Sequence, residues 1–175
     1  MMLGLGHDVV DIAAFATQLE ESGGGTRRLF SPRELRQAAI RAQAKHDGEV
    51  VHLAAKWAGK EAVLKAWCEA LSAASLPLPY AVDDFPWPQI EILDDSRGVP
   101  HVALAADPQR RVSDSLAPLL RSTASLDAAA NAPTVGRTAQ SGSHDAAASG
   151  PLPIWHISLS HDGPIASAVV ILIGA

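Results

Sequence analysis

The sequence predicts a single α+β domain over residues 1–175, in which an antiparallel sheet packs with one long and one shorter helix. Three observations lead to this prediction. The length of 175 residues is usual for one domain with a core of its own. Strand-like segments come in pairs joined by short turns, and helices lie between them without the regular alternation of a doubly wound sheet. The longest helical segment carries an apolar stripe.

The first predicted strand covers residues 1–12. Two sets of residues alternate there with the two-residue period of a strand: Leu3, Leu5, His7 and Val9, and Gly4, Gly6, Asp8 and Val10. Gly4 and Gly6 carry no side chain, so their face leaves room for a ligand or a packed helix. A helix is then expected from Ser31 to about Lys45, because Ser31-Pro32 followed by Glu34 has the form of a capped helix start.

The remaining elements follow in order along the chain. The long helix covers Glu49–Leu71, and proline-rich turns separate it from two strands at Gln89–Leu93 and Pro100–Leu104. Residues 110–120 have a helical pattern that Pro118 interrupts. The segment 125–150 is rich in Ala, Ser and Gly and is predicted to be a low-complexity surface loop or linker. The last two strands, Trp155–Ser160 and Ile165–Ile173, form a hairpin.

Glu61 is the most informative residue of the long helix. At about 100° per residue, the apolar stripe has Glu61 near its centre and consists of Val50, Leu53, Ala54, Trp57, Leu64, Cys68 and Leu71. Burying an unpaired carboxylate is costly, or makes it take up a proton. The charge therefore needs a partner, which is either a bound cation or a buried Lys or Arg side chain.

Asp8 is a second acidic residue on a largely apolar segment. With Glu61 it would supply two oxygen ligands, which suits Mg²⁺ held by one or two carboxylates plus substrate phosphates and waters. Lys65 lies one turn after Glu61, and Lys60 and Lys56 flank it on the same helix. Lysines beside such a pair are what a phosphoryl or pyrophosphate substrate requires. The alternatives are that Asp8 caps the strand end and that the lysines are solvated.

A third group of polar residues lies where the last hairpin turns. Ser158, Ser160 and His161 can bind phosphate oxygens or an adenine–ribose edge, although Ser and His are also common at turns.

Composition and missing motifs exclude several classes of function. The net charge of −5 argues against a general nucleic-acid binder. The single cysteine excludes an internal disulfide and agrees with a reducing compartment. No apolar run is long enough to span a bilayer and no secretory signal is found, so we expect no membrane association and a cytoplasmic location. The dinucleotide fingerprint that Gly4 and Gly6 begin is broken at Val9.

Three segments, in order and with matching spacing, resemble the signatures of the holo-acyl-carrier-protein synthases, which are small 4′-phosphopantetheinyl transferases. They are Gly4–Ile12, Trp57–Ala66 and Ile157–His161, and Phe30–Glu34 resembles a fourth family segment. The run from His52 to Trp67 is most similar to actinobacterial members.

This resemblance implies the family's fold and the transfer of 4′-phosphopantetheine from coenzyme A to a serine of an acyl carrier protein, with release of 3′,5′-ADP. It implies that Asp8 and Glu61 hold Mg²⁺ with the pyrophosphate of coenzyme A, and that Lys65 contacts the transferred phosphate. It also implies a coenzyme A site lined by Lys56, Lys60, Ser160 and His161 and, beyond single residues, a homotrimer with active sites between subunits. The base that deprotonates the serine is either Glu61 or a metal-bound water.

The chain departs from the family pattern at several positions. His7 replaces an aliphatic or Thr residue, and Lys56 replaces an arginine found in many members. Residues 13–15 lack the basic residue with which many bacterial members dock free carrier proteins, so a carrier domain of a type I fatty-acid synthase is an alternative partner. Two other functions remain open: a noncatalytic trimeric scaffold that binds carriers, and a Mg²⁺-dependent nucleotide hydrolase.

Overall fold

The computed structural model describes residues 1–21, 25–130 and 152–174. Among these residues the α-helices are α1 (Ile12–Glu20), α2 (Pro32–Lys45), α3 (Glu49–Ala73) and α4 (Ala106–Ala130). The strands are β1 (Met2–Asp11), β2 (Ile90–Asp94), β3 (Pro100–Leu104), β4 (Ile154–Asp162) and β5 (Ile165–Ile173). Short 3₁₀ helices are η1 (Thr26–Leu29), η2 (Val82–Asp84) and η3 (Trp87–Gln89). None of the described helices has the length and apolarity needed to cross a membrane.

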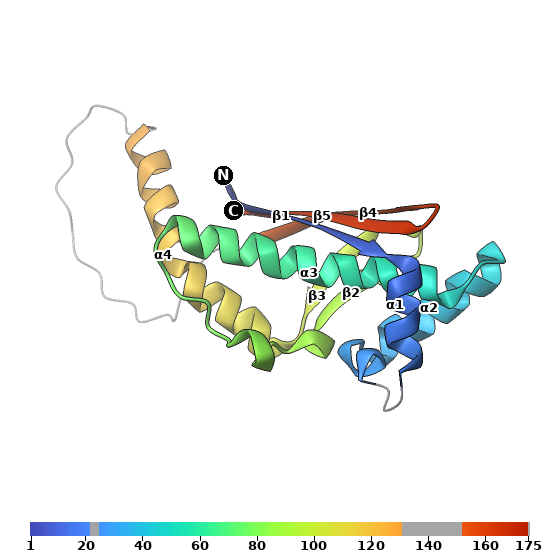
Figure 1. Cartoon of the computed structure of the whole chain (residues 1–175). Coiled ribbons are helices and arrows are strands. Elements are labelled where there is room, and N and C mark those ends of the chain that lie inside the picture. The colour runs from blue at the N-terminus through green and yellow to red at the C-terminus, as the bar shows by residue number, and fades with distance from the viewer. Residues whose placement is uncertain (22–24, 131–151, 175) are drawn as a thin grey trace.

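The strands form two antiparallel sheets. The first has the order β1-β5-β4, and β2 and β3 pair in the second. Figure 1 shows α3 running along one face of the three-stranded sheet, with α1 and α2 towards its N-terminal end and α4 towards its C-terminal end. Helices that cover one face of an antiparallel sheet define an α+β domain, which confirms the predicted fold class.

Strand β1 lies directly against α3 because its inward positions are small. Gly4 and Gly6 face the helix, where a Cβ atom at Gly6 would lie only 2.8 Å from the carbonyl carbon of Ala62 and 2.7 Å from the nitrogen of Ala66. Of the two occupants that the sequence allowed for this face, a packed helix is therefore the one beside the glycines. Asp8 and Val10 are the next inward residues and are also buried.

Local sequence signals predicted some of the helix ends correctly, and other helix ends differ from the prediction. Helix α2 begins with the predicted capping box, because Ser31 accepts from the Glu34 amide at 3.2 Å and Glu34 accepts from the Ser31 amide at 2.8 Å. Helix α4 is longer than predicted: it begins at Ala106 and continues through Pro118 to Ala130. Residues 125–130, which we expected to start a loop, are thus helical, and the rest of that predicted loop lies outside the described residues.

The second face of the three-stranded sheet is not covered by any described helix (Figure 1). Its residues alternate with the buried ones and include exposed large apolar side chains: Leu5, Val9, Ile154, Ile165 and Val169. His7 lies among them and its Nε2 is 3.0 Å from the Ser167 hydroxyl. This surface is named the open sheet face below.

Candidate functional site

Asp8, Glu61 and Lys65 come together at the contact between β1 and α3. Asp8 faces the helix with its side chain only 9% exposed, and the Lys65 ammonium donates to its Oδ1 at 2.6 Å. Glu61 and Lys65 are one helical turn apart on α3. The three residues predicted to carry the chemistry are therefore neighbours, although Asp8 lies more than fifty positions before the other two.

The electrostatics of this cluster are dominated by two close carboxylates. Burial raises the pKa of Glu61 above its usual value, and the neighbouring Asp8 carboxylate raises it further, while Lys65 opposes the shift. The pKa of Lys65 is raised in turn, chiefly by its hydrogen bond to Asp8. Two acidic groups with one exposed lysine leave a net negative site, and a cation would relieve the repulsion.

The cluster opens into a pocket between β1, α1 and α3. Its lining includes Asp8, Asp11, Phe15, Gln18, Trp57 and Glu61. Asp11 also caps α1, where its Oδ1 accepts from the Ala14 amide at 2.9 Å. This volume is named the acidic pocket. The contribution of α1 to it was not predicted, since no local signal in residues 12–20 links them to Glu61.

The residues present fit a magnesium ion. Mg²⁺ is usually held by one or two protein carboxylates, with water and substrate phosphates completing an octahedron. Asp8 and Glu61 supply two such carboxylates beside a pocket with room for further ligands. No set of three or more His, Cys, Asp or Glu side chains that could hold a metal is found among the described residues, so an all-protein cage is not formed there.

The position of Glu61 on α3 differs from the prediction. Glu61 is half-buried at the rim of the helix, as are Trp57 and Leu64. The fully buried face consists instead of the small residues that meet β1, with larger side chains beside them: Ala58, Ala62, Val63, Ala66, Trp67 and Ala70. The predicted stripe was drawn mainly from large apolar residues and left out most of the alanines. Glu61 was therefore placed at the centre of the buried face, whereas it lies at the edge of that face.

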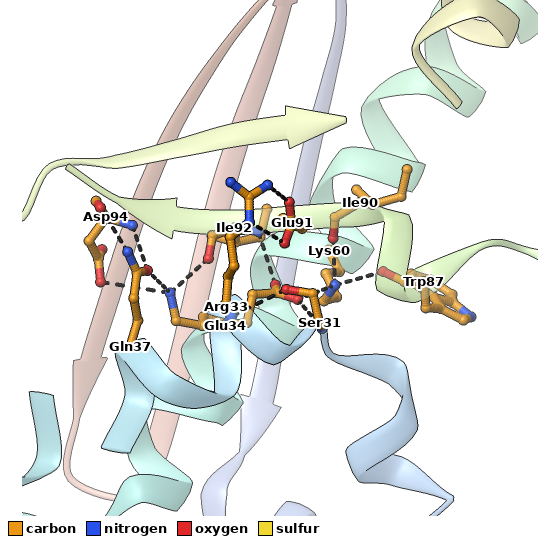
Figure 2. Close-up of polar contacts among 11 residues, drawn as sticks. Ser31, Arg33, Glu34, Gln37, Lys60, Trp87, Ile90, Glu91, Ile92 and Asp94 are labelled. Carbon is orange, nitrogen blue, oxygen red and sulfur yellow. Dashed lines mark hydrogen bonds and ion pairs between the residues drawn. The ribbon is translucent and has the colours of Figure 1, made fainter. Parts of the chain in front are cut away.

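A buried Lys–Glu pair does exist on α3, but it is formed by the residue before Glu61. Lys60 is 0% exposed and its ammonium lies 2.9 Å from the carboxylate of Glu34, which is also fully buried. The same nitrogen donates to the carbonyl of Trp87 at 2.7 Å and to that of Ile90 (Figure 2). The structure thus places the Lys60 ammonium in the core, and the role in the coenzyme A site that the resemblance implies for it stays a prediction.

Lys56 occupies a related position one turn earlier. Its ammonium donates to the Ile92 carbonyl at 2.7 Å and to Gln37 at 3.3 Å, and lies 3.7 Å from the carboxylate of Asp94. Burial lowers the pKa of Lys56, although Asp94 partly offsets this effect. Lys56 and Lys60 thus join α3 to α2 and β2 through adjacent sets of acceptors, of which Figure 2 labels those of Lys60.

Lys56 and His161 both line a second pocket, which is named the basic pocket. Its charged and imidazole side chains are Arg41, Lys45, His52, Lys56, Asp94 and His161. Asp94 lies 3.5 Å from Arg41 as well as near Lys56, so one carboxylate faces several cationic groups. Arg41 and Lys45 were not predicted, although their spacing of four residues on α2 places them on one helix face.

Ser160 does not lie with His161. The two are consecutive residues of β4, so their side chains point to opposite faces of the sheet. Ser160 is exposed and pairs with Ser167 across β5, on the open sheet face. The structure therefore brings together Asp8, Glu61 and Lys65 in one site, and Lys56 with His161 in another.

The α+β fold, with two carboxylates and a lysine gathered at one site, suits an enzyme that transfers a phosphorus-containing group. Comparison with known proteins makes the assignment specific. A profile of the 4′-phosphopantetheinyl transferase superfamily matches residues 4–125. The chain belongs to this family, which confirms the resemblance found in the sequence.

Curated relatives agree with that assignment. The chain is 50% identical over 172 residues to a holo-[acyl-carrier-protein] synthase of Bifidobacterium animalis subsp. lactis, covering 98% of this chain and 97% of the relative. It is 31% identical over 171 residues to the protein of the same name from Mycobacterium leprae, covering 98% and 96%.

Among solved structures, the chain is similar to one described as a Chronobacterium ammoniagenes ACPS-CoA complex. The TM-score is 0.69 at 26% identity, and the match covers 100% of this chain and 98% of the other.

Proposed function

We propose that this protein transfers the 4′-phosphopantetheine group of coenzyme A to a serine hydroxyl of an apo acyl carrier protein. The observation that carries the proposal is that Asp8 and Glu61 line one pocket and that Lys65 donates to Asp8 beside it. Two carboxylates with an adjacent, half-exposed ammonium suit a magnesium-bound pyrophosphate. The relatives named above, which include one at 50% identity over nearly the whole chain, are holo-[acyl-carrier-protein] synthases.

Asp8 and Glu61 are the residues that would hold Mg²⁺ in this reaction. When bound, the ion neutralises charge on the pyrophosphate of coenzyme A and orients it for in-line attack. Lys65 is 51% exposed and its present partner is Asp8. From this half-exposed position beside Asp8, the Lys65 ammonium would be able to donate a hydrogen bond to a phosphate oxygen.

The proposed reaction exchanges one P–O bond of coenzyme A for a P–O bond to the carrier serine. The serine oxygen forms a bond to the phosphorus that carries pantetheine, and the P–O bond to the second phosphate breaks. The electron pair of that bond leaves with 3′,5′-ADP, where Lys65 stabilises the developing negative charge. The serine proton passes to a base at the site, which is either Glu61 or a water molecule held there.

The basic pocket is proposed to receive the nucleotide end of coenzyme A, which carries a phosphate monoester. Lys45, Lys56 and His161 are suited to such an anion. The acidic pocket lies at the β1 edge of the three-stranded sheet and the basic pocket at the β4 edge. Each chain thus carries the proposed metal-binding part of an active site at one edge of the sheet and the proposed nucleotide-binding part at the other edge.

We further propose a homotrimer in which neighbours complete each active site. A ring of copies needs two different surfaces on each chain, and the two pockets supply them. The open sheet face supplies apolar area for the association, since Leu5, Val9 and Val169 are exposed there. We place the reaction in the cytoplasm, in fatty-acid biosynthesis, with either a free carrier protein or a carrier domain of a type I synthase as the acceptor.

A mass measurement tests the proposed function. The protein is incubated with coenzyme A, Mg²⁺ and apo carriers, one free and one from a type I synthase, and each carrier is weighed intact. The expected result is a gain of one phosphopantetheine group on at least one carrier. Binding without a mass gain would instead favour the noncatalytic scaffold, and phosphate release without a carrier would favour the hydrolase.

A further inference from the structure

Three side chains form a row that ends in the basic pocket. Asp47 lies in the connection between α2 and α3, and its Oδ1 is 2.7 Å from Nε2 of His52 near the start of α3. The His52 ring meets the ring of His161 edge to face, with centroids 5.9 Å apart and planes at 88°. His161 itself comes from β4. The row therefore connects the end of α2 to a residue proposed to bind coenzyme A.

The first two members of this row are held firmly. His52 is 8% exposed, so its ring has little freedom to turn. Asp47 follows His46, which has a left-handed φ of 57°, and its amide donates to the Ala42 carbonyl at 3.1 Å. The hydrogen bond to His52 lowers the pKa of Asp47, so this carboxylate is ionised at neutral pH. His161, by contrast, is exposed and depends on its contacts for its orientation.

The other charged groups of the basic pocket give His161 its importance. Asp94 ion-pairs with Arg41 at 3.5 Å and with Lys56 at 3.7 Å, so two of the cations are already partly neutralised. Recognition of an anion in the pocket then depends more on Lys45 and His161. A ring that is held in one orientation binds with a smaller loss of conformational freedom than one that turns freely.

We propose that His52, oriented by Asp47, is a positioning residue that fixes the ring of His161 for recognition of the phosphate monoester of coenzyme A. The inference rests on the proposed function. It assigns a role to two residues that contact neither the acidic pocket nor the transferred phosphate, and it identifies the terminal phosphate as the part of the substrate they govern.

Calorimetric binding to the intact protein tests this role. The probes are adenosine 3′,5′-bisphosphate and adenosine 5′-monophosphate, which lacks the 3′-phosphate. His161→Ala and His52→Ala are each expected to weaken bisphosphate binding about tenfold, the loss of one charge-assisted hydrogen bond. The double variant should bind no more weakly than His161→Ala alone. Binding of the monophosphate should stay unchanged in all three.

Further variants separate positioning from a loss of folding. His101→Ala removes an exposed histidine of β3 that does not line the basic pocket, and it should bind both probes like the wild type. Asp47→Ala leaves the His52 ring in place but removes its anchor, so it should weaken bisphosphate binding in the same direction as His52→Ala. Urea unfolding midpoints are measured for each variant.

Additive effects of His52→Ala and His161→Ala, or equal losses for both probes, would overturn the proposal. Unchanged bisphosphate binding in both His52→Ala and Asp47→Ala would do the same. A wild-type protein that shows the expected coupling but adds no phosphopantetheine to any carrier would refute the proposed function and leave this inference standing.

Discussion

Replacing Gly6 by alanine should push β1 away from α3 and disturb the acidic pocket. The added Cβ would lie 2.7 Å from the nitrogen of Ala66 and 2.8 Å from the carbonyl carbon of Ala62, and real Cβ atoms essentially never come within 3.0 Å of such neighbours. Both neighbours are backbone atoms, so no side-chain rotation relieves the clash. The carbonyl oxygen of Ala62 lies closer still to the added Cβ, so the strand must move by more than the roughly 0.7 Å that would restore an ordinary contact of 3.4 Å with the Ala66 nitrogen.

The expected change in the free energy of unfolding is the difference between two opposing contributions. Overpacking of this kind costs about 1–3 kcal/mol. Replacing Gly by Ala recovers about 0.4–1 kcal/mol by restricting the unfolded chain, where the folded state tolerates it. We therefore expect Gly6→Ala to lower the free energy of unfolding by about 1–2 kcal/mol. Asp8 lies two residues further along β1, and a displacement near 1 Å at a reacting site can reduce transfer by up to about 100-fold.

Urea unfolding and the carrier mass assay measure the two effects separately. Gly25→Ala is the matched control, because its added Cβ meets nothing within 4 Å among the described residues and its φ is −57°. The control should keep full transfer activity and stay within about 0.5 kcal/mol of the wild type. Equal unfolding midpoints for Gly6→Ala and Gly25→Ala would refute the close packing of β1 on α3 as the reason for glycine at this position.

Three further predictions concern charge and assembly. Glu61→Gln should abolish transfer yet stabilise the metal-free protein at neutral pH. The pKa of Glu61 is raised in the folded state, so ionising its carboxylate lowers the free energy of unfolding as the pH rises above 4.5. Urea unfolding with a chelator present should therefore show the stabilisation at neutral pH and its loss below pH 4.5. Lys60→Met should lower the free energy of unfolding by about 3–5 kcal/mol, because it leaves Glu34 buried without its ion-pair partner. Adding Glu34→Gln should recover most of this stability. A stable Lys60→Met variant with weakened coenzyme A binding would contradict the placement of Lys60 in the core. Val169→Asp should convert the proposed trimer to monomers in light scattering, and an unchanged mass would argue against assembly through the open sheet face.

The parts of the fold that sequence could predict depend on local chemistry. The capping box of Ser31 and Glu34 predicted the start of α2, and strands β3 and β5 have the bounds expected from their apolar runs. The start of α4 was missed. Asp107 in its first turn accepts from the hydroxyl of Tyr80 at 2.8 Å, a contact across 27 positions that no local pattern contains.

Asp8 and Glu61 could be singled out from sequence because their residue type is unusual for its surroundings. Asp8 and Glu61 each stood out as a carboxylate in an apolar segment, and both lie at the same pocket. The fate of Lys60 could not be predicted in the same way. Its acceptors include the carbonyls of Trp87 and Ile90, some thirty residues later, and a backbone carbonyl has no sequence signature.

The placement of Lys60 nevertheless explains how Glu61 is held. Successive helix residues are about 100° apart, so fixing Lys60 towards the core sets Glu61 at the rim beside Asp8. Lys60 has three oxygen partners, from α2, η3 and β2, which prevent α3 from rotating about its axis. On the opposite side, Gly4 and Gly6 set the distance of β1 from the helix. The spacing of the two carboxylates is thus fixed from both sides of α3. From sequence, a buried ion pair was the alternative to a metal as the partner of Glu61. In the structure, a buried ion pair is formed by Lys60 and instead helps to hold Glu61 at the proposed metal site.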